Sequence, residues 1–400
     1  AAGFFAAITC AEANPACRVT IFERGKNVLE KVRISGGGRC NATHACFDAR
    51  ELVKFYPRGS RELLAPFLQF GPEQTVAWFA RRGVPLKTEA DGRMFPVTDN
   101  SQTIVDCLLR AARQAGVQVR TGARVERLEP AASTGWRLHL TGTENPLLFD
   151  RVMVASGSNT AVWALLRTLG HTIVEPVPSL FTFNTKDTRL RDLSGLSVSH
   201  TALRIPGTKL SAKGPLLVTH WGLSGPAVLR LSAWGARDLH RLDYRFPLEI
   251  NFSGENNPDE VLKDLQRLKA EGGKKQVAAN ARFGLPLRLW QNLVTAAGIP
   301  EEKRWADLDK KQLAALHAQL TAAGFRIAGK STFKEEFVTA GGVALKEVNF
   351  KTFESKMQPG LFLAGEVLDI DAITGGFNFQ AAWTGGWLAG QAMATASSPL

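Results

Sequence analysis

The sequence lacks any apolar run as long as the about 20 residues that a membrane-spanning helix requires. We therefore expect a soluble intracellular protein, cytoplasmic by default, with an organelle left open because the sequence begins inside a motif. Cysteine is also scarce: the five residues form no Cys-x-x-Cys motif, and no histidine stands at zinc-ligand spacing. We expect reduced thiols and no metal site. The cysteines are Cys10, Cys17, Cys40, Cys46 and Cys107.

Three arrangements of catalytic side chains are missing as well. No metal cluster, nucleophile triad or carboxylate pair stands out, so the chemistry would have to be that of a bound cofactor. A redox disulfide between Cys40 and Cys46 is the weaker alternative, because five residues separate them in a pattern unlike that of flavin disulfide reductases. The chain has 400 residues, 44% of them hydrophobic, which predicts two or three domains with a large core.

A glycine-rich stretch near the end of the sequence predicts a ligand-binding edge. Residues 361–364 are apolar and favour a fully buried strand, which ends at Gly365 and Glu366. After a polar loop, Gly375 and Gly376 open a helix rich in alanine and glycine. Backbone amides at the helix start and a carboxylate at the strand end would suit an electron-poor ring and a sugar alcohol.

The beginning of the sequence supplies a second part of such a site. A helix carries Gly3 in its first turn, and residues 18–22 favour a strand that ends at Glu23. The spacing of twenty residues matches that between the last glycine of a dinucleotide fingerprint and the acid that binds a ribose. The preceding strand and the first two glycines are absent, and a small residue at a helix–sheet crossing is the alternative interpretation.

Two further loops resemble ligand-binding edges. Residues 35–41 read Ser-Gly-Gly-Gly-Arg-Cys-Asn, a loop of bare amides, one fixed charge and short polar groups, although a flexible surface loop has the same composition. Residues 151–155 favour a strand that ends in the small residues 156–159. Ligands of open α/β sheets bind at such carboxyl ends of strands.

With these motifs the chain resembles the YhiN-like and BaiN-like flavoproteins over its whole length. The shared segments are residues 35–41, Asp-Gly-Arg-x-Phe-Pro at 91–96, Thr-His-x-Gly-Leu-Ser-Gly-Pro at 219–226 and Gly-Glu-x-Leu-Asp-Ile-Asp at 365–371. Ala372 departs from the glycine that many members have there. The resemblance implies an α/β fold: a glutathione-reductase-like FAD-binding Rossmann domain with an inserted β-barrel domain and a helical cap.

The resemblance and the sequence pattern together predict the domain boundaries. Residues 1–175 and 340–400 would form the FAD-binding domain, residues 176–255 and 325–339 the barrel, and residues 256–324 the helical insertion.

FAD and NAD(P)H are the implied cofactor and co-substrate. Cys40 and His220 are the candidate proton donors; a small residue packed under the flavin and a structural histidine are the respective alternatives. The residues expected to bind FAD are Gly3, Glu23, Arg24, Ser35, Gly36, Gly37, Gly38, Arg39, Cys40, Asn41, Val125, Ala155, Ser156, Gly157, Gly365, Glu366, Gly375, Gly376, Phe377 and Asn378.

The expected reaction is transfer of hydride from NAD(P)H, through flavin, to an activated C=C bond. The family suggests a uridine of ribosomal RNA or a small conjugated acid as substrate. Oxidation of a small amine and a flavin-stabilised RNA-binding module are the alternatives.

Charge favours RNA, because the excess of basic residues lies in the body and the insertions. Residues 160–254 carry 11 basic and 6 acidic groups and residues 255–335 carry 14 and 10, whereas residues 336–400 carry 3 and 6. Basic residues also alternate with Phe55 and Tyr56 in residues 50–61, where an anionic contact competes with a solvated helix face whose aromatics enter the core. A basic groove for RNA would draw on Arg189, Arg191, Lys209, Lys213, Lys274 and Lys275.

Overall fold

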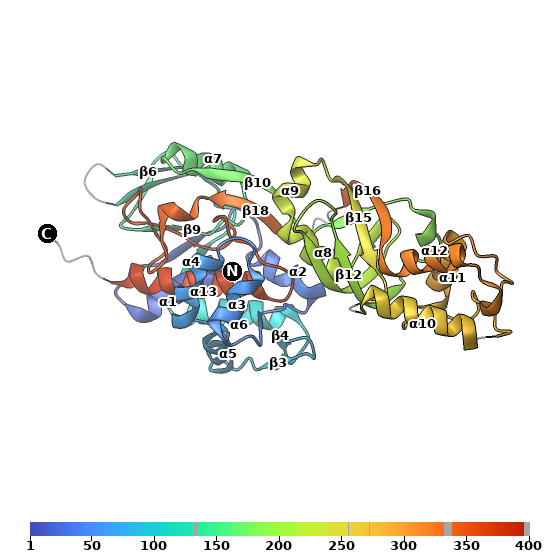
Figure 1. Ribbon diagram of the computed structural model, residues 1–400. Coiled ribbons are helices and arrows are strands. Elements are labelled where there is room, and N and C mark those ends of the chain that lie inside the picture. The colour runs from blue at the N-terminus through green and yellow to red at the C-terminus, as the bar shows by residue number, and fades with distance from the viewer. Residues whose placement is uncertain (132–134, 255, 272, 332–337, 396–400) are drawn as a thin grey trace. The chain divides into compact units, whose positions relative to one another are not determined.

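The computed structural model describes residues 1–131, 135–254, 256–271, 273–331 and 338–395. The chain forms two compact units: unit 1 comprises Ala1–Val177 and Val338–Leu400, and unit 2 comprises Pro178–Phe337 (Figure 1). Unit 2 is therefore an insertion in unit 1, with ends close to the predicted boundaries. The division of the insertion into a barrel and a cap stays a prediction, and residues 332–337 of its segment 325–339 lie outside the described residues.

Unit 1 combines helices with several small sheets. Its helices are α1 (Ala2–Ala13), α2 (Glu30–Gly38), α3 (Ala49–Leu52), α4 (Ser60–Gln69), α5 (Pro72–Ala80), α6 (Ser101–Gln114), α7 (Thr160–Thr168) and α13 (Phe377–Ala394), with 3-10 turns η1 (Val53–Phe55) and η4 (Leu345–Glu347). Its strands are β1 (Thr20–Phe22), β2 (Thr43–His44), β3 (Leu86–Thr88), β4 (Arg93–Pro96), β5 (Gln118–Arg120), β6 (Val125–Pro130), β7 (Trp136–Leu140), β8 (Leu147–Phe149), β9 (Val152–Val154), β10 (Ile173–Ser179), β18 (Val338–Val343), β19 (Val348–Asn349), β20 (Glu354–Ser355) and β21 (Leu361–Leu363).

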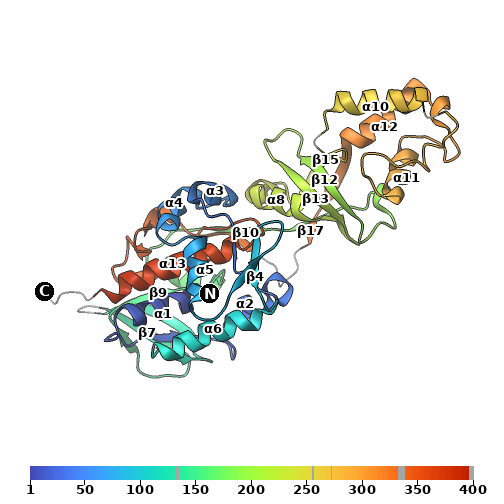
Figure 2. The ribbon, with the colours of Figure 1, turned by 90° about the horizontal axis from the view of Figure 1, so that it is seen from below.

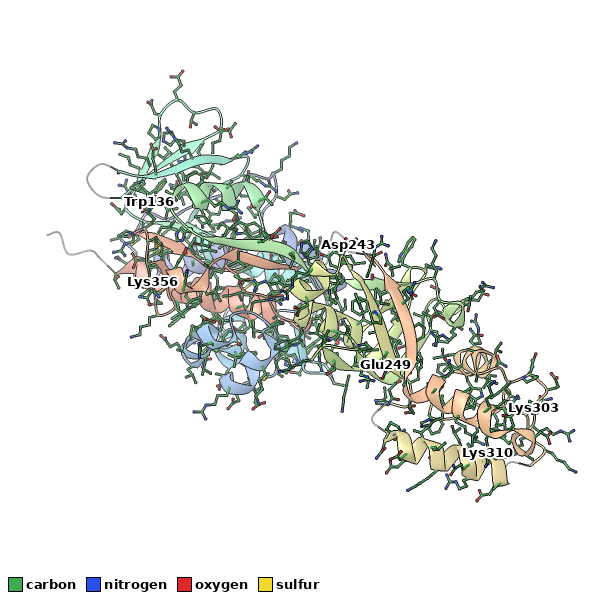
Figure 3. All side chains as sticks on the ribbon, turned by 45° about the horizontal axis from the view of Figure 1, so that its top comes forward. Trp136, Asp243, Glu249, Lys303, Lys310 and Lys356 are labelled. Carbon is green, nitrogen blue, oxygen red and sulfur yellow. The ribbon has the colours of Figure 1, made fainter. Side chains whose placement is uncertain are left out.

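Two parallel strand pairs carry the predicted ligand edges. Strand β1 pairs with β5, and β9 pairs with β21 in the register Val152–Leu361 to Val154–Leu363. Strand β21 is buried along its whole length, as its apolar sequence predicts. Because β9 and β21 are parallel, the segments that follow them start at the same edge of the sheet. Strands β6, β7 and β8 form an antiparallel meander, which buries Trp136 (Figure 3).

The first and last helices of unit 1 lie side by side (Figure 1). Helix α1 is apolar on all sides, and Phe5 and Ile8 are fully buried, which is typical of a helix inside a core. Helix α13 meets it through glycines: a Cβ added to Gly386 would lie 2.6 Å from the Ala2 carbonyl oxygen, and one on Gly390 would lie 2.6 Å from that of Ala6. Only glycine permits so close an approach of two backbones.

In the residues of unit 2 that the structure describes, a seven-stranded sheet and the longer helices share a hydrophobic core (Figure 2). The sheet order is β16-β15-β12-β13-β14-β11-β17; closure of this sheet into a barrel stays a prediction. The strands are β11 (Thr182–Asn184), β12 (Ser197–Arg204), β13 (Ser211–Val218), β14 (Gly222–Ser224), β15 (Arg245–Asn251), β16 (Ala323–Ala328) and β17 (Lys330–Ser331). The helices are α8 (Pro226–Trp234), α9 (Ala236–Arg241), α10 (Pro258–Glu271), α11 (Leu287–Ala296) and α12 (Lys310–Thr321), with turns η2 (Thr188–Leu190) and η3 (Trp305–Asp307).

Candidate functional site

Small residues bring the chain start against the carboxyl ends of β9 and β21. A Cβ added to Gly3 would lie 3.3 Å from Ala155 Cβ, and one on Gly365 would lie 3.5 Å from Ala2 Cβ. Gly157 follows the same strand end, where an added Cβ would lie 3.6 Å from Glu366 Oε2. The structure therefore joins three of the four predicted edges in one place.

Two carboxylates follow strands that end in this region. Glu23 follows β1, and its Oε1 accepts a hydrogen bond of 2.7 Å from the Gly25 amide. Glu366 follows β21 and forms an ion pair with Lys31 of α2. The charges of Glu23, Glu366 and Lys31 all lie within electrostatic range of the Ala1 nitrogen. Two acids thus flank the bare backbone, as an extended ligand with two hydroxyl-bearing parts would require.

The glycine-rich loop 35–41 interrupts α2 at its end. Gly36 and Gly37 have left-handed φ angles of 58° and 66°, and Ser35 is extended. A Cβ added to Gly37 or Gly38 would meet no atom within 4 Å, so the backbone faces open space there. A backbone hydrogen bond closes the loop: the Cys40 amide donates to the Ser35 carbonyl at 3.0 Å.

Asn41 joins this loop to the start of α13. With its amide oriented to satisfy both atoms, Oδ1 accepts from the Gly376 amide at 2.9 Å, and Nδ2 donates to the carbonyls of Thr43 and Met94 at 2.9 and 3.3 Å. The loop, which is the fourth predicted edge, therefore adjoins the start of α13. Asn41 holds it there with one of the amides that a helix start leaves unpaired.

Several predicted ligands of FAD are already engaged within the protein. The Arg39 guanidinium forms ion pairs with Glu89 at 2.6 Å and Asp99 at 3.5 Å and covers the Phe95 ring at 4.0 Å. Asn378 exchanges two hydrogen bonds with the backbone of Ala372, of 2.9 and 3.1 Å. We therefore interpret both side chains as supports of the site.

Phe377 is also enclosed by protein. It is 2% exposed and stacks against both His44 and Phe55, with ring centroids 4.6 and 4.4 Å away. The Tyr56 hydroxyl donates to its carbonyl at 2.6 Å. Among the aromatics of residues 50–61, Tyr56 is fully buried, as the core interpretation predicts, whereas Phe55 is half-buried.

The two candidate proton donors have contrasting surroundings. Cys40 is fully buried in the core of unit 1, and burial raises the pKa of its thiol to about 12. This favours the packing role that was its alternative. His220 is exposed in unit 2, at the turn between β13 and β14. Of the remaining predicted residues, Arg24 and Ser156 are exposed and Val125 is half-buried at the start of β6.

Sequence reasoning missed two ion pairs of this region. Lys31 stands one turn before the glycine loop, where a cation next to a predicted ligand loop was a usable signal. Arg58 pairs with the fully buried Asp371, which ties the segment after η1 to the end of the 365–371 motif. Nothing in the sequence connects two residues that are 313 positions apart.

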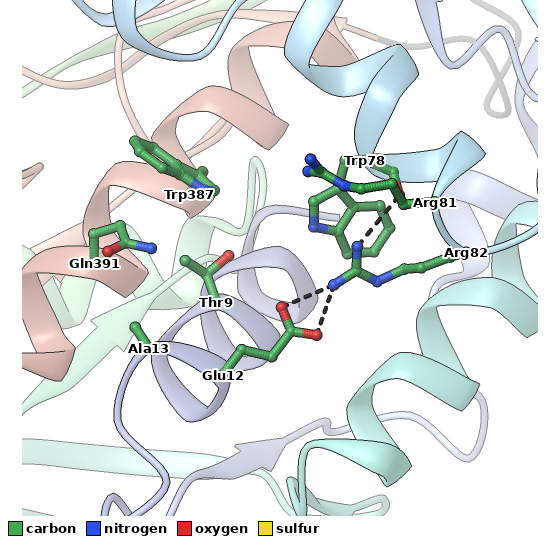
Figure 4. Close-up of a pocket in the computed structure, with 8 residues that line it drawn as sticks. All are labelled: Thr9, Glu12, Ala13, Trp78, Arg81, Arg82, Trp387 and Gln391. Carbon is green, nitrogen blue, oxygen red and sulfur yellow. Dashed lines mark hydrogen bonds and ion pairs between the residues drawn. The ribbon is translucent and has the colours of Figure 1, made fainter.

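A pocket of about 350 Å³ lies elsewhere in unit 1, among the C-terminal parts of α1 and α13 and the end of α5 (Figure 4). None of the predicted site residues lines it. Arg82 covers the Trp78 ring at 3.8 Å and donates to both carboxylate oxygens of Glu12, at 2.6 and 2.8 Å, so its charge is neutralised within the pocket wall.

Within the described residues, no group of three or more His, Cys, Asp or Glu side chains could hold a metal ion. No helix in that part of the chain is long and apolar enough to cross a membrane. The five cysteines are free, and the Cys10 thiol interacts with that of Cys17.

Comparison with known proteins places these features in a family. Residues 1–392 match the HI0933-like protein Rossmann domain. The chain is 30% identical to the 3-dehydro-bile acid delta(4,6)-reductase of Clostridium scindens, over 98% of this chain and 97% of that one. It is 28% identical to the ribosomal RNA dihydrouridine synthase of Escherichia coli, over 100% and 97%.

A solved structure shares the fold. It is the 3-ketosteroid-delta4-(5alpha)-dehydrogenase from Rhodococcus jostii RHA1 in complex with 4-androstene-3,17-dione, 15% identical with a TM-score of 0.53, over 99% of this chain and 95% of that one. The α/β FAD-binding Rossmann fold that the resemblance implies is confirmed.

Proposed function

We infer the reaction from the premise that this chain belongs to the HI0933-like proteins with a Rossmann domain and is an FAD-dependent oxidoreductase. We propose that it reduces an activated C=C bond with hydride from NAD(P)H, and that its substrate is a uridine of ribosomal RNA. A cytoplasmic location is part of this proposal. Bound FAD would supply the hydride chemistry.

The observation that carries the proposal is the combination of full-length similarity with the distribution of charge. Two relatives that match over nearly all of their length are named for reduction of carbon–carbon double bonds, in a bile acid and in a uridine. Unit 2 carries 24 basic and 16 acidic residues, a surplus that suits a polyanion better than a small apolar acid.

The residues of unit 1 fit FAD. Gly3, Ala155 and Gly365 leave the backbone bare where a pyrophosphate would approach, and Glu23 and Glu366 could accept hydroxyl hydrogen bonds from the ribose and the ribityl chain. The open backbone at Gly37 and Gly38 would face the ring. Lys31, paired with Glu366, would hold that carboxylate charged and in position.

The chain must also supply a proton to the carbon next to the one that accepts hydride. Cys40 is a poor donor, because its thiol is sealed in the core and its pKa is raised to about 12. His220, whose ring is accessible to solvent, stays the proposed donor. His220→Gln should lower the turnover number and leave bleaching of the flavin by NADPH unchanged.

A mass-spectrometric comparison of ribosomal RNA nucleosides, from cells with and without this protein, tests the substrate. We expect one uridine to be two mass units heavier in the presence of the protein, and this change to disappear with Glu366→Ala. An anaerobic titration with NADPH should bleach the flavin of the purified protein. A bleached flavin without any change in RNA would overturn the uridine assignment.

Reduction of a small conjugated acid is the second candidate, favoured by the 30% identity to the bile acid reductase. It predicts NADPH consumption with such an acid and no dependence on RNA. An RNA-binding module without catalysis predicts a flavin that NADPH leaves oxidised. An amine oxidase would bleach its flavin with amine alone.

A further inference from the structure

The 219–226 motif forms a rigid hairpin in unit 2, and most of its residues have a structural role. The Thr219 amide donates to the Gly222 carbonyl at 2.8 Å and the reverse bond is 3.3 Å, so His220 and Trp221 form a two-residue hairpin loop between β13 and β14. Gly222 has a φ of 147°, and a Cβ there would lie 2.3 Å from the Phe183 carbonyl oxygen.

The rest of the motif builds the core and the next helix. Leu223 is fully buried, Gly225 has a φ of 91°, and Pro226 occupies the first turn of α8, where its ring is favourable. Folding therefore accounts for the glycines, the leucine and the proline. It does not account for the side chains at the tip.

Those two side chains face water. His220 is exposed, and Trp221 is 57% exposed, although a large indole gains most when it is buried. The hairpin bonds fix the tip, and the Thr185 amide donates to the Trp221 carbonyl at 3.0 Å, so the indole is carried by an anchored backbone. An exposed aromatic on a rigid support costs little conformational entropy when it binds a flat partner.

Two cations lie on segments that are hydrogen-bonded to the tip, directly or through Thr185. Lys186 follows Thr185 directly, and the Thr185 hydroxyl donates to the Arg326 carbonyl at 2.9 Å. Both Lys186 and Arg326 are exposed. Aromatic rings that stack on unpaired bases, next to cations that contact phosphates, are how proteins bind single-stranded nucleic acid.

We propose that this hairpin tip, defined by His220 and Trp221 with Lys186 and Arg326, is a contact surface for unpaired nucleotides of RNA, on which Trp221 stacks a base. The inference rests on the proposed function and adds to it the place on unit 2 that holds the substrate strand. The basic groove expected from the sequence requires revision at one position. Arg189 is bonded to Asp187, Gln319 and the Gly324 carbonyl and covers the Phe325 ring, so it belongs to the fold.

Trp234 provides a matched control. It is 44% exposed, also lies in unit 2, and ends α8 rather than a hairpin. The holoenzyme with Trp221→Ala, Trp221→Phe or Trp234→Ala would be titrated with a 12-nucleotide single-stranded RNA, with FAD content as the measure of folding. We expect Trp221→Ala to weaken the dissociation constant about tenfold and Trp221→Phe about twofold, since a smaller ring still stacks. Trp234→Ala should leave it unchanged.

Equal affinities of the Trp221→Ala and Trp234→Ala proteins, at normal FAD content, would overturn the inference. Failure of the proposed function looks different. If the ribosomal RNA shows no reduced uridine but Trp221→Ala still weakens RNA binding tenfold, the contact surface stands and the reaction assignment falls. If uridine is reduced and Trp221→Ala leaves the KM for RNA unchanged, the reaction stands and the contact surface falls.

Discussion

The two units differ in some of their polar contacts and in net charge. In unit 1, Arg58 and Asp371 pair in the interior, and His171 lies buried between Glu347 and Ser355, 3.0 and 3.1 Å away. Unit 2 leaves many of its cations at the surface, including Lys310 on the helical part that Figure 3 labels. Its formal charge is +8, against +4 for the larger unit 1. A preorganised interior suits a small cofactor, and a cationic surface suits a long anion.

The largest effect should come from breaking the buried pair of unit 1. Arg58→Ala removes a cation that pairs with the fully buried Asp371, and we expect a loss of about 3–5 kcal/mol in the free energy of unfolding. Chemical denaturation followed by tryptophan fluorescence measures it. In unit 2, Arg204 pairs with Glu249 but is 63% exposed, so Arg204→Ala is the control and should have no measurable effect. Equal effects of the two variants would contradict the comparison.

Cofactor binding should respond to unit 1 alone. Glu23→Ala and Glu366→Ala each remove a charged hydrogen-bond acceptor, and we expect FAD affinity to fall by about 1.5–3 kcal/mol, or roughly 10- to 150-fold. Equilibrium dialysis with FAD measures the change. Glu249→Ala in unit 2 serves as the control. Full FAD occupancy of the Glu23→Ala protein at low FAD concentration would show that the ribose assignment is wrong.

The sequence predicts those features of the site that depend on residues close together in the chain. Strand β21, the meander and the glycine loop follow from apolar runs and turn residues within a few positions, and the 365–376 edge follows from them. The partners of Arg39 and Phe377 could not be predicted, because they come from segments that meet only in the folded unit. Composition marks a loop as able to bind a ligand, but long-range packing decides which side chains are already used.

A smaller effect, confined to acid, is expected at Glu347. Burial alone would raise the pKa of this carboxyl, but hydrogen bonds from Thr172 and His171 outweigh burial and leave the pKa below its usual 4.5. Ionised Glu347 therefore stabilises the fold above that pH, and the contribution disappears as the pH falls through the lowered pKa. Glu347→Gln should lower the Tm at pH 7 and converge with the parent protein in acid. Parallel Tm curves across the whole pH range would be inconsistent with this.

The smallest effect is expected from a pair of surface lysines in unit 2. Lys274 and Lys275 are exposed in the loop after α10, and loss of both should reduce the slope of log affinity for RNA against log salt by about 1–2. FAD content should not change. Affinity measured between low and physiological salt tests this, with Lys87→Ala in unit 1 as the control. An RNA affinity that responds neither to salt nor to these substitutions would favour the small conjugated acid.

The insertion of unit 2 within unit 1 has a consequence for synthesis on the ribosome. The Asn14 side chain, just after α1, bonds to the Ala394 carbonyl at the end of α13, across 380 positions of the chain. At about 5–20 residues per second, α1 waits roughly 20–80 s for the helix that covers it. Unit 2 is contiguous and has its own core, so it can fold during this interval. The nascent chain thus carries a finished insertion between two halves of an unfinished domain, and the apolar helix α1 stays uncovered until α13 is made.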